Sequence, residues 1–292
     1  MTDHPLSQVS FQHPGLPELH SDCLSCFGLC CAALPFAASS DFAIDKQAGQ
    51  PCPNLRGDFR CGIHTELRTR GFRGCTVYDC FGAGQKVSQQ TYGGHDWRQA
   101  PETAGQMFEA FLVMRQLHEL LWYLHEAIDF YAVDSLHSSM KSLLEQTTEL
   151  TSLPPDELVK LNVPLHRAEI NGLLLQASEL TRTATLKQLK PAPGRQKNYG
   201  RGADLIGAKL RQADLRCTSL RGAYLIAADL SGADLRYCDL IGADLRDTNL
   251  CSADLRHALF LTQAQLQAAK GDHTTRLPER LSYPEHWAAA LH

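Results

Sequence analysis

A leucine recurs at every fifth position from residue 205 to residue 255 without interruption, and this repeat constrains the fold more than any other feature of the sequence. Two residues before each leucine stands a small side chain, most often alanine. A period of five fits neither an α-helix, with about 3.6 residues per turn, nor a flat strand, with a period of about two. The chain must therefore turn at a fixed interval, which predicts a solenoid. The leucines are Leu205, Leu210, Leu215, Leu220, Leu225, Leu230, Leu235, Leu240, Leu245, Leu250 and Leu255.

These A-[DN]-L-x-x units resemble the pentapeptide-repeat family. The resemblance implies a right-handed quadrilateral β-helix with four units in each coil. The leucine and the small residue would face a narrow core, and the other three positions would face outward. Twelve units, the last containing Ala258 and Phe260, would make three coils, about 14 Å tall at about 4.8 Å per coil. Residues 262–270 predict an amphipathic helix, ending at Gly271, that covers the C-terminal edge.

The middle of the chain shows apolar residues spaced three and four apart, which indicates helices. We expect one long helix over 102–130 and shorter ones over 134–150, 155–161 and 165–186, separated by prolines. The predicted fold class is therefore multidomain. Its parts are a cysteine-rich metal-binding domain at 1–98, an α-helical region at 99–186, a linker at 187–201, the pentapeptide-repeat β-helix at 202–261, and a C-terminal capping helix and tail at 262–292.

Eight of the eleven cysteines lie between residues 23 and 80. The first 20 residues contain no Lys or Arg, so we expect no export signal, and the apolar run 27–38 is too short to span a bilayer. The expected compartment is the cytoplasm, where clustered thiols indicate a metal site rather than disulfides. The candidate metal ligands are Cys23, Cys26, Cys30, Cys31, Cys52, Cys61, Cys75 and Cys80.

Cysteines two or three residues apart let one turn offer two thiolates to the same ion, and a distant second pair closes a tetrahedron. The spacing therefore suits zinc or an iron-sulfur cluster. Eight thiolates could hold two zinc ions, one iron-sulfur cluster with spare thiols, or one ion beside a redox-active pair. No helix or strand pattern competes in this zone, so we expect ligands to hold it more than packing does.

The same zone resembles the YkgJ-like cysteine-cluster family, which is associated with zinc or iron chelation. Its elements are a C-C pair, a C-x-x-L, a C-x-[IV]-[YH] and a C-x-x-[FY]. They correspond here to Cys30-Cys31, Cys52 to Leu55, Cys61 to His64, and Cys75 to Tyr78. This chain adds Cys23, Cys26 and Cys80 to that pattern and has Arg73-Gly74 where the family usually has R-P.

Other residues give weaker indications of a functional site. His64, three residues after Cys61, has a spacing compatible with ligation or with an ordinary surface histidine. His118 and His125 lie seven residues apart, two helical turns, and are expected to be structural. Residues 82–85 predict a turn and not a phosphate loop, and the common hydrolase motifs are absent. The sequence therefore identifies no catalytic residue and leaves open whether the protein is an enzyme.

Charge argues against nucleic acid and membrane partners. The net charge is −4, and residues 201–260 carry eight acidic and eight basic side chains, so the solenoid has no net field. We expect a metal-binding protein whose solenoid binds a protein partner or serves regulation. An iron-sulfur or thiol-dependent redox enzyme is the alternative. A weaker alternative is a protein that protects gyrase by mimicking DNA, because such mimicry needs a long, negatively charged rod.

Overall fold

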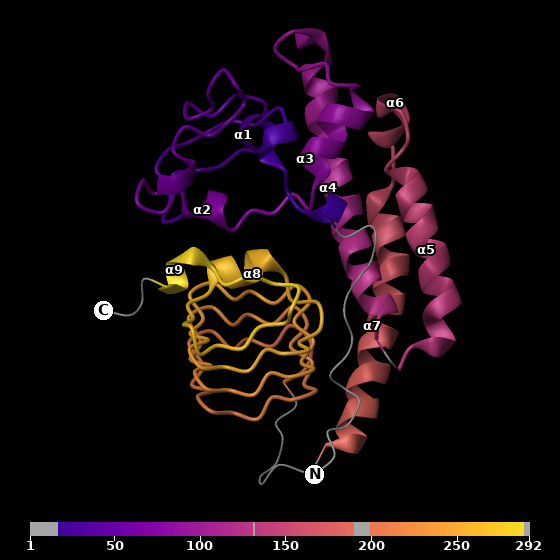
Figure 1. Cartoon of the computed structure of the whole chain (residues 1–292), viewed down its shortest axis with the longest axis vertical. Helices are drawn as coiled ribbons and strands as arrows, with labels where there is room; N and C mark the ends of the chain where they lie inside the picture. The colour runs from indigo at the N-terminus through magenta and orange to yellow at the C-terminus, as the bar shows by residue number, and fades with distance from the viewer. Residues whose placement is uncertain (1–16, 131, 190–198, 289–292) are drawn as a thin grey trace. The chain divides into compact units, whose positions relative to one another are not determined.

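The computed structural model describes residues 17–130, 132–189 and 199–288 (Figure 1). It divides into two compact units. The N-terminal unit comprises Met1–Asp129 and Asp134–Leu174, and the C-terminal unit comprises Phe130–Val133 and Leu175–His292. Most of the predicted linker falls at 190–198, outside the described residues. In the part of the chain that is described, no helix is both long enough and apolar enough to cross a membrane.

The expected helical middle is confirmed. Its helices are α4 (Ala104–Ile128), α5 (His137–Leu150), α6 (Pro155–Leu158) and α7 (Val163–Gln188). Short 3₁₀ turns at Pro101–Thr103 and Asp134–Leu136 lead into α4 and α5. The N-terminal half of α7 is tied to its neighbours by polar contacts, because Arg167 pairs with Glu119 of α4 at 2.8 Å and His166 bonds Thr147 of α5 at 2.8 Å. His118 is structural, as expected, since its buried ring bonds the Phe81 carbonyl at 2.7 Å.

In the described part of the cysteine-rich zone, residues 17–98, the helical elements are short. They are α1 (Leu29–Ala33), α2 (Arg73–Thr76) and 3₁₀ turns at Pro17–Leu19, Cys23–Ser25 and His64–Glu66. A further helix, α3 (Ala83–Gln85), runs directly into a π-helical turn at Lys86–Thr91. The turn expected at 82–85 is therefore a helix start: Gly82, at φ 79°, provides its left-handed entry residue.

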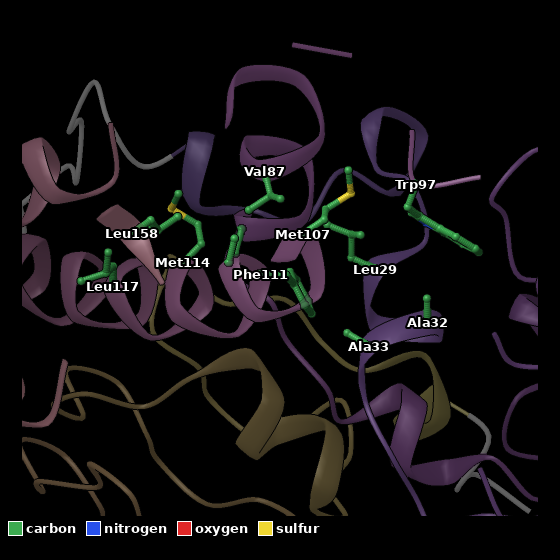
Figure 2. Packing of buried hydrophobic residues seen from close by; sticks show 12 residues of the cluster. Leu29, Ala32, Ala33, Val87, Trp97, Met107, Phe111, Met114, Leu117 and Leu158 are labelled. Atoms are coloured by element: carbon green, nitrogen blue, oxygen red, sulfur yellow. The ribbon is translucent and has the colours of Figure 1, made fainter. Parts of the chain in front are cut away.

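The expectation that ligands, more than packing, hold the cysteine-rich zone is corrected by its core. Leu29, Ala32 and Ala33 of α1, Val87 of the π-helical turn, and Trp97 are buried in one cluster with α4, as Figure 2 shows. From α4 the cluster takes Met107, Ala110, Phe111, Met114 and Leu117. Burial of this apolar surface stabilises both ends of the zone at roughly 25 cal/mol per Å². The zone and the helical middle thus share a hydrophobic core.

The repeat segment forms the stacked coils drawn in orange to yellow in Figure 1. Parallel bridges join residues twenty apart, such as Asp214 to Asp234 and Asp234 to Asp254, so four units make one coil. The leucines from Leu215 to Leu255 are buried, as predicted, whereas Leu205 and Leu210 of the first coil are half-buried. The second residue after each leucine from Leu205 to Leu255 has a positive φ, between 55° and 68°. This left-handed residue turns the corner and explains the period of five.

Two neighbouring corners give a stability prediction. Gly222 has φ 65° and no atom within 4 Å of the place that a Cβ would take, whereas Ala227 has φ 55° with its Cβ already present. We expect Gly222→Ala to lower the free energy of unfolding by about 0.5–1 kcal/mol, because an L-residue is strained in the left-handed region. Ala227→Gly should shift it in the opposite direction. Denaturant unfolding checks this pair, and shifts of the same sign would contradict the assigned corners.

One side of the solenoid departs from the expected outward-facing pattern. Asp239 and Arg221 occupy outward repeat positions, yet both side chains are buried and paired at 3.3 Å. The C-terminal half of α7 covers them: Ser178 donates to Asp239 at 2.6 Å. Cys217, also expected to face solvent, is buried, and Arg182 of α7 donates to its carbonyl at 3.1 Å. On this side of the solenoid, α7 therefore buries residues that occupy outward repeat positions.

The C-terminal cap is only partly the predicted helix. Helix α8 covers Gln263–Ala268 and is opened by a capping box between Thr262 and Gln265. It ends before Lys270, because Lys270 bridges to Asn249 and so extends the ladders of the coils, as Arg276 does by bridging to Asp254. The last helix, α9 (Glu285–Ala288), places Trp287 against Gly271, where a Cβ would lie 2.5 Å from the indole. The solenoid thus continues past residue 261.

Candidate metal centre

Short segments position the eight clustered cysteines, and no long element carries them. Cys23 opens a 3₁₀ turn, Cys30 and Cys31 lie on α1, and Cys75 lies on α2. Of the others, Cys61 forms an isolated antiparallel bridge with Leu55, and Cys26, Cys52 and Cys80 lie in loops between elements. All eleven cysteines of the chain are free thiols. The thiols are therefore available to a metal ion.

Two of these thiols lie beside Gly84 of α3. A Cβ on Gly84 would lie 2.6 Å from Cys26 Sγ and 3.8 Å from Cys80 Sγ, so only glycine leaves room for both sulfurs. The Ser21 hydroxyl lies 3.1 Å from Cys80 Sγ. Arg115 of α4 fixes the segment before Cys80 by donating to the Asp79 carbonyl at 3.1 Å. Cys26 and Cys80, which are far apart in sequence, thus both lie beside Gly84.

Burial is the largest influence on the thiols of Cys26, Cys61 and Cys80 and raises the pKa of each. Backbone N–H groups offset part of that rise: those of Leu29 and Gly28 at Cys26, and that of Ile63 at Cys61. At Cys80 the Ser21 hydroxyl and the Gly84 N–H have the same effect. Hydrogen bonds from amides to sulfur are a common outer shell of thiolate metal sites. A structural thiol in a dry core would gain little from them.

Charge on Cys30 would act on several thiols of the cluster. The sulfur of Cys30 lies 4.0 Å from Cys31 Sγ. Burial raises the pKa of the Cys26 thiol to about 12 and that of the Cys75 thiol to about 12, and in both cases charge on Cys30 adds to the rise. Removal from water likewise raises the pKa of Cys23 to about 11, again with a contribution from Cys30. Without a cation, these groups remain neutral thiols at pH 7.

The structure does not present a finished donor group. Among residues 17–130, 132–189 and 199–288, no three His, Cys, Asp or Glu side chains lie close enough together to hold one ion. His64 is exposed on its 3₁₀ turn, and His20 packs edge-on against Trp122 at 5.5 Å. The structure therefore does not support the predicted metal-binding domain as it stands, because metal binding would require the sulfurs to move closer together.

Sequence reasoning missed the residues that hold the first cysteines in place. Gln85 donates to the His20 carbonyl at 2.7 Å and accepts from the Asp22 amide at 3.1 Å. Ser88 of the π-helical turn accepts from the Phe27 amide at 3.0 Å. Two glycines within four residues disfavour a helix, which hid the element carrying these side chains. In the sequence, only the nearness of Gly82 and Gly84 to Cys80 could have indicated that this element helps to position the cysteines.

On the outer face of the solenoid, aspartates and arginines pair with one another, so their charges cancel locally. Asp214 pairs with Arg216 at 2.7 Å, and the same pairing recurs at 2.6 Å in the next two coils. Hydrogen bonding from Arg216 holds the pKa of Asp214 below its usual range. Arg216 also lies 3.7 Å from Asp234 of the next coil. The acidic and basic ladders therefore neutralise each other.

Comparison with known proteins places these features in context. The pentapeptide-repeat family model matches residues 203–240 and 228–270, with eight repeat copies. Over 270 residues the chain is 59% identical to YybG, an uncharacterized protein of Bacillus subtilis (strain 168), covering 92% of this chain and 95% of the relative. A match of that length includes both the cysteine-rich zone and the solenoid.

Proposed function

The chain belongs to the same family as Bacillus subtilis YybG, and we propose that it is a cytoplasmic metal-binding protein whose solenoid presents a rigid surface to a protein partner. The cysteines between Cys23 and Cys80 would bind zinc or an iron-sulfur cluster. The resemblance of this zone to YkgJ-like chelating proteins agrees with that assignment. Binding would draw these thiols closer together.

The observation that carries the proposal is the approach of two free thiols to the same glycine. Cys26 and Cys80 both border Gly84. A tetrahedral thiolate site of zinc needs four sulfurs at about 2.3 Å from the ion. Zinc binding would therefore bring the cysteine sulfurs closer to one another. A metal bound there would lower the pKa of the thiols and tie the two ends of the zone to the central segment.

Substitution of cobalt for zinc tests the site in solution. Thiolate–cobalt charge-transfer absorption near the ultraviolet should appear on titration and be displaced by zinc. Cys26→Ser should weaken the band, since it removes a sulfur at the Gly84 pair, whereas Cys251→Ser in the solenoid should leave it unchanged. Titration without a thiolate band, or equal bands in both variants, would exclude these cysteines as ligands.

The redox-enzyme alternative has less support. Nucleophilic thiols need a lowered pKa, and the pKa of Cys26 is raised to about 12 by burial. An iron-sulfur centre remains within the proposal, since the same donors serve both metals. Visible absorption of protein purified without oxygen distinguishes them: a brown protein indicates a cluster, and a colourless one with bound zinc indicates the structural or regulatory role.

The neutralised ladders yield a prediction about nucleic acid. We expect no binding to duplex DNA at physiological salt and no protection of gyrase from a fluoroquinolone. The reason is that the three stacked aspartates each pair with an arginine, so no continuous negative stripe is presented. A supercoiling assay checks this. Rescue of gyrase by a few-fold molar excess of the protein would make DNA mimicry the leading function.

A further inference from the structure

The first coil of the solenoid ends in an open β edge. In the next coil each bridging residue uses both of its backbone groups: the Tyr224 amide donates to the Ala203 carbonyl at 2.9 Å, and the Tyr224 carbonyl accepts from the Leu205 amide at 2.9 Å. The equivalent residues of the first coil have no hydrogen-bond partner for their amides and carbonyls within the described residues; they are Asp204, Lys209, Asp214 and Ser219. An unpaired edge of this kind is a template for pairing with another chain.

Apolar side chains at this edge are incompletely covered. Leu205 and Leu210 are half-buried, whereas Leu225 and Leu230, twenty residues later, are fully buried. Ile206, which follows Leu205 at the corner between the first two sides, is 58% exposed. A partner that covers the edge would therefore bury apolar surface as well as pair the backbone.

Two charged side chains at the edge lack a counter-ion. Asp204 and Lys209 hold the same repeat position on adjacent sides of the first coil, and both are exposed. In the described part of the chain neither has an ion-pair partner, and the Asp204 carboxylate accepts a hydrogen bond from the Ile206 amide at 3.2 Å. Asp214, on the third side, differs because it pairs with Arg216 at 2.7 Å.

These charges are complementary to the same edge of a second copy. In a two-fold symmetric contact between coil ends, the facing strands are antiparallel, and residues directly opposite each other can exchange both backbone hydrogen bonds. An axis through the corner at Ile206 places Asp204 of each copy opposite Lys209 of the other. An axis through the middle of a side would instead place Asp204 opposite Asp204 or Asp214 of the second copy. Charge therefore favours the corner axis.

We propose that the protein forms a two-fold symmetric dimer in which the first coils of two copies pair edge to edge, with Asp204 of each copy opposite Lys209 of the other. Ile206 then lies beside Ile206 of the second copy, at the axis. This inference goes beyond the proposed function and does not depend on metal binding. One coil end is small compared with the roughly 1,200–2,000 Å² buried in stable interfaces, so we expect a concentration-dependent dimer with a micromolar Kd.

Charge reversal tests the contact. Asp204→Lys places lysine opposite lysine, and Lys209→Asp places aspartate opposite aspartate. In analytical ultracentrifugation of the full chain, each variant should raise the Kd of the dimer by about 10-fold or more. Lys270→Asp is the matched control: it makes the same charge change on the same side of the solenoid, at the far end of the bridge ladder. This control should dimerise as the wild type does.

Mixing the two edge variants restores opposite charges at both contacts. With D204K tagged and K209D untagged, an equimolar mixture should form a heterodimer with an affinity close to that of the wild-type dimer, although each variant alone dimerises poorly. Formation of the heterodimer also shows that both variants are folded, which circular dichroism checks separately.

Three results would overturn the dimer. One is a wild-type chain that remains monomeric up to about 100 μM, a concentration well above a micromolar Kd. Another is dimerisation of D204K and K209D with the affinity of the wild type, which would place any dimer contact elsewhere. The third is a mixture of the two folded variants that forms no heterodimer. None of these results depends on the metal content of the protein.

Discussion

Leu230→Asp should unfold the solenoid. Leu230 is fully buried in the middle of the stack, with coils on both sides. Loss of the leucine costs about 2–5 kcal/mol, and a carboxylate without a partner in that narrow core adds several more. The total is comparable to the whole stability of an ordinary domain, about 5–15 kcal/mol. Circular dichroism and thermal unfolding should show loss of the repeat unit's cooperative transition.

An outward substitution in the following repeat is the matched control. Arg236 pairs with Asp234 at 2.6 Å on a partly exposed ladder. Arg236→Ala should therefore lower the free energy of unfolding by about 1 kcal/mol at most. Equal thermal stability of the two variants would show that the inward and outward positions have been assigned incorrectly.

Metal removal should open one part of the cysteine-rich zone and leave the rest folded. Between residues 35 and 75 the buried side chains are Lys46, Cys52, Leu67 and Phe72. Only the partly buried Leu55 and Phe59 of this segment pack against the core shared with α4. Helix α1 and the π-helical turn instead share a core with α4. After treatment with a strong chelator, amide exchange over 35–75 should accelerate by about tenfold or more. Exchange in the buried face of α4 should change little.

Two variants provide the comparison for this experiment. Cys61→Ser removes a candidate ligand of the central segment and should reproduce the effect of the chelator. Cys251→Ser, in the solenoid, should respond to the chelator as the wild type does. Unchanged exchange over 35–75 after complete metal removal would show that packing alone holds the segment.

The repeat made the solenoid predictable from sequence, because inward and outward positions follow from local periodicity. The same reasoning placed α4 and α5 within a few residues, since their apolar spacing is regular. It could not show which outward face is covered. Asp239 has the same local pattern as Asp234, yet α7 buries only Asp239. That difference depends on contacts between residues about sixty positions apart.

The candidate metal centre was predictable in its donors and not in its surroundings. Cysteine spacing identified the thiols, whereas the role of Gly84 depends on Cys26 approaching from 58 residues earlier in the chain. The burial of Lys46 could not be predicted from the sequence, because a single lysine in a polar stretch is ordinarily a solvated side chain. The core shared by Leu29, Trp97 and Phe111 was missed for a similar reason. Short apolar runs in the cysteine-rich zone show no periodicity by themselves.

The central claim, that the thiols between Cys23 and Cys80 bind a transition metal, is tested most directly by elemental analysis. Protein purified without oxygen should contain at least about one equivalent of zinc or iron per chain, given the tight binding typical of thiolate sites. Replacing Cys26, Cys30 and Cys80 together by serine should remove it. Less than about half an equivalent of any transition metal in the wild-type chain would contradict the claim.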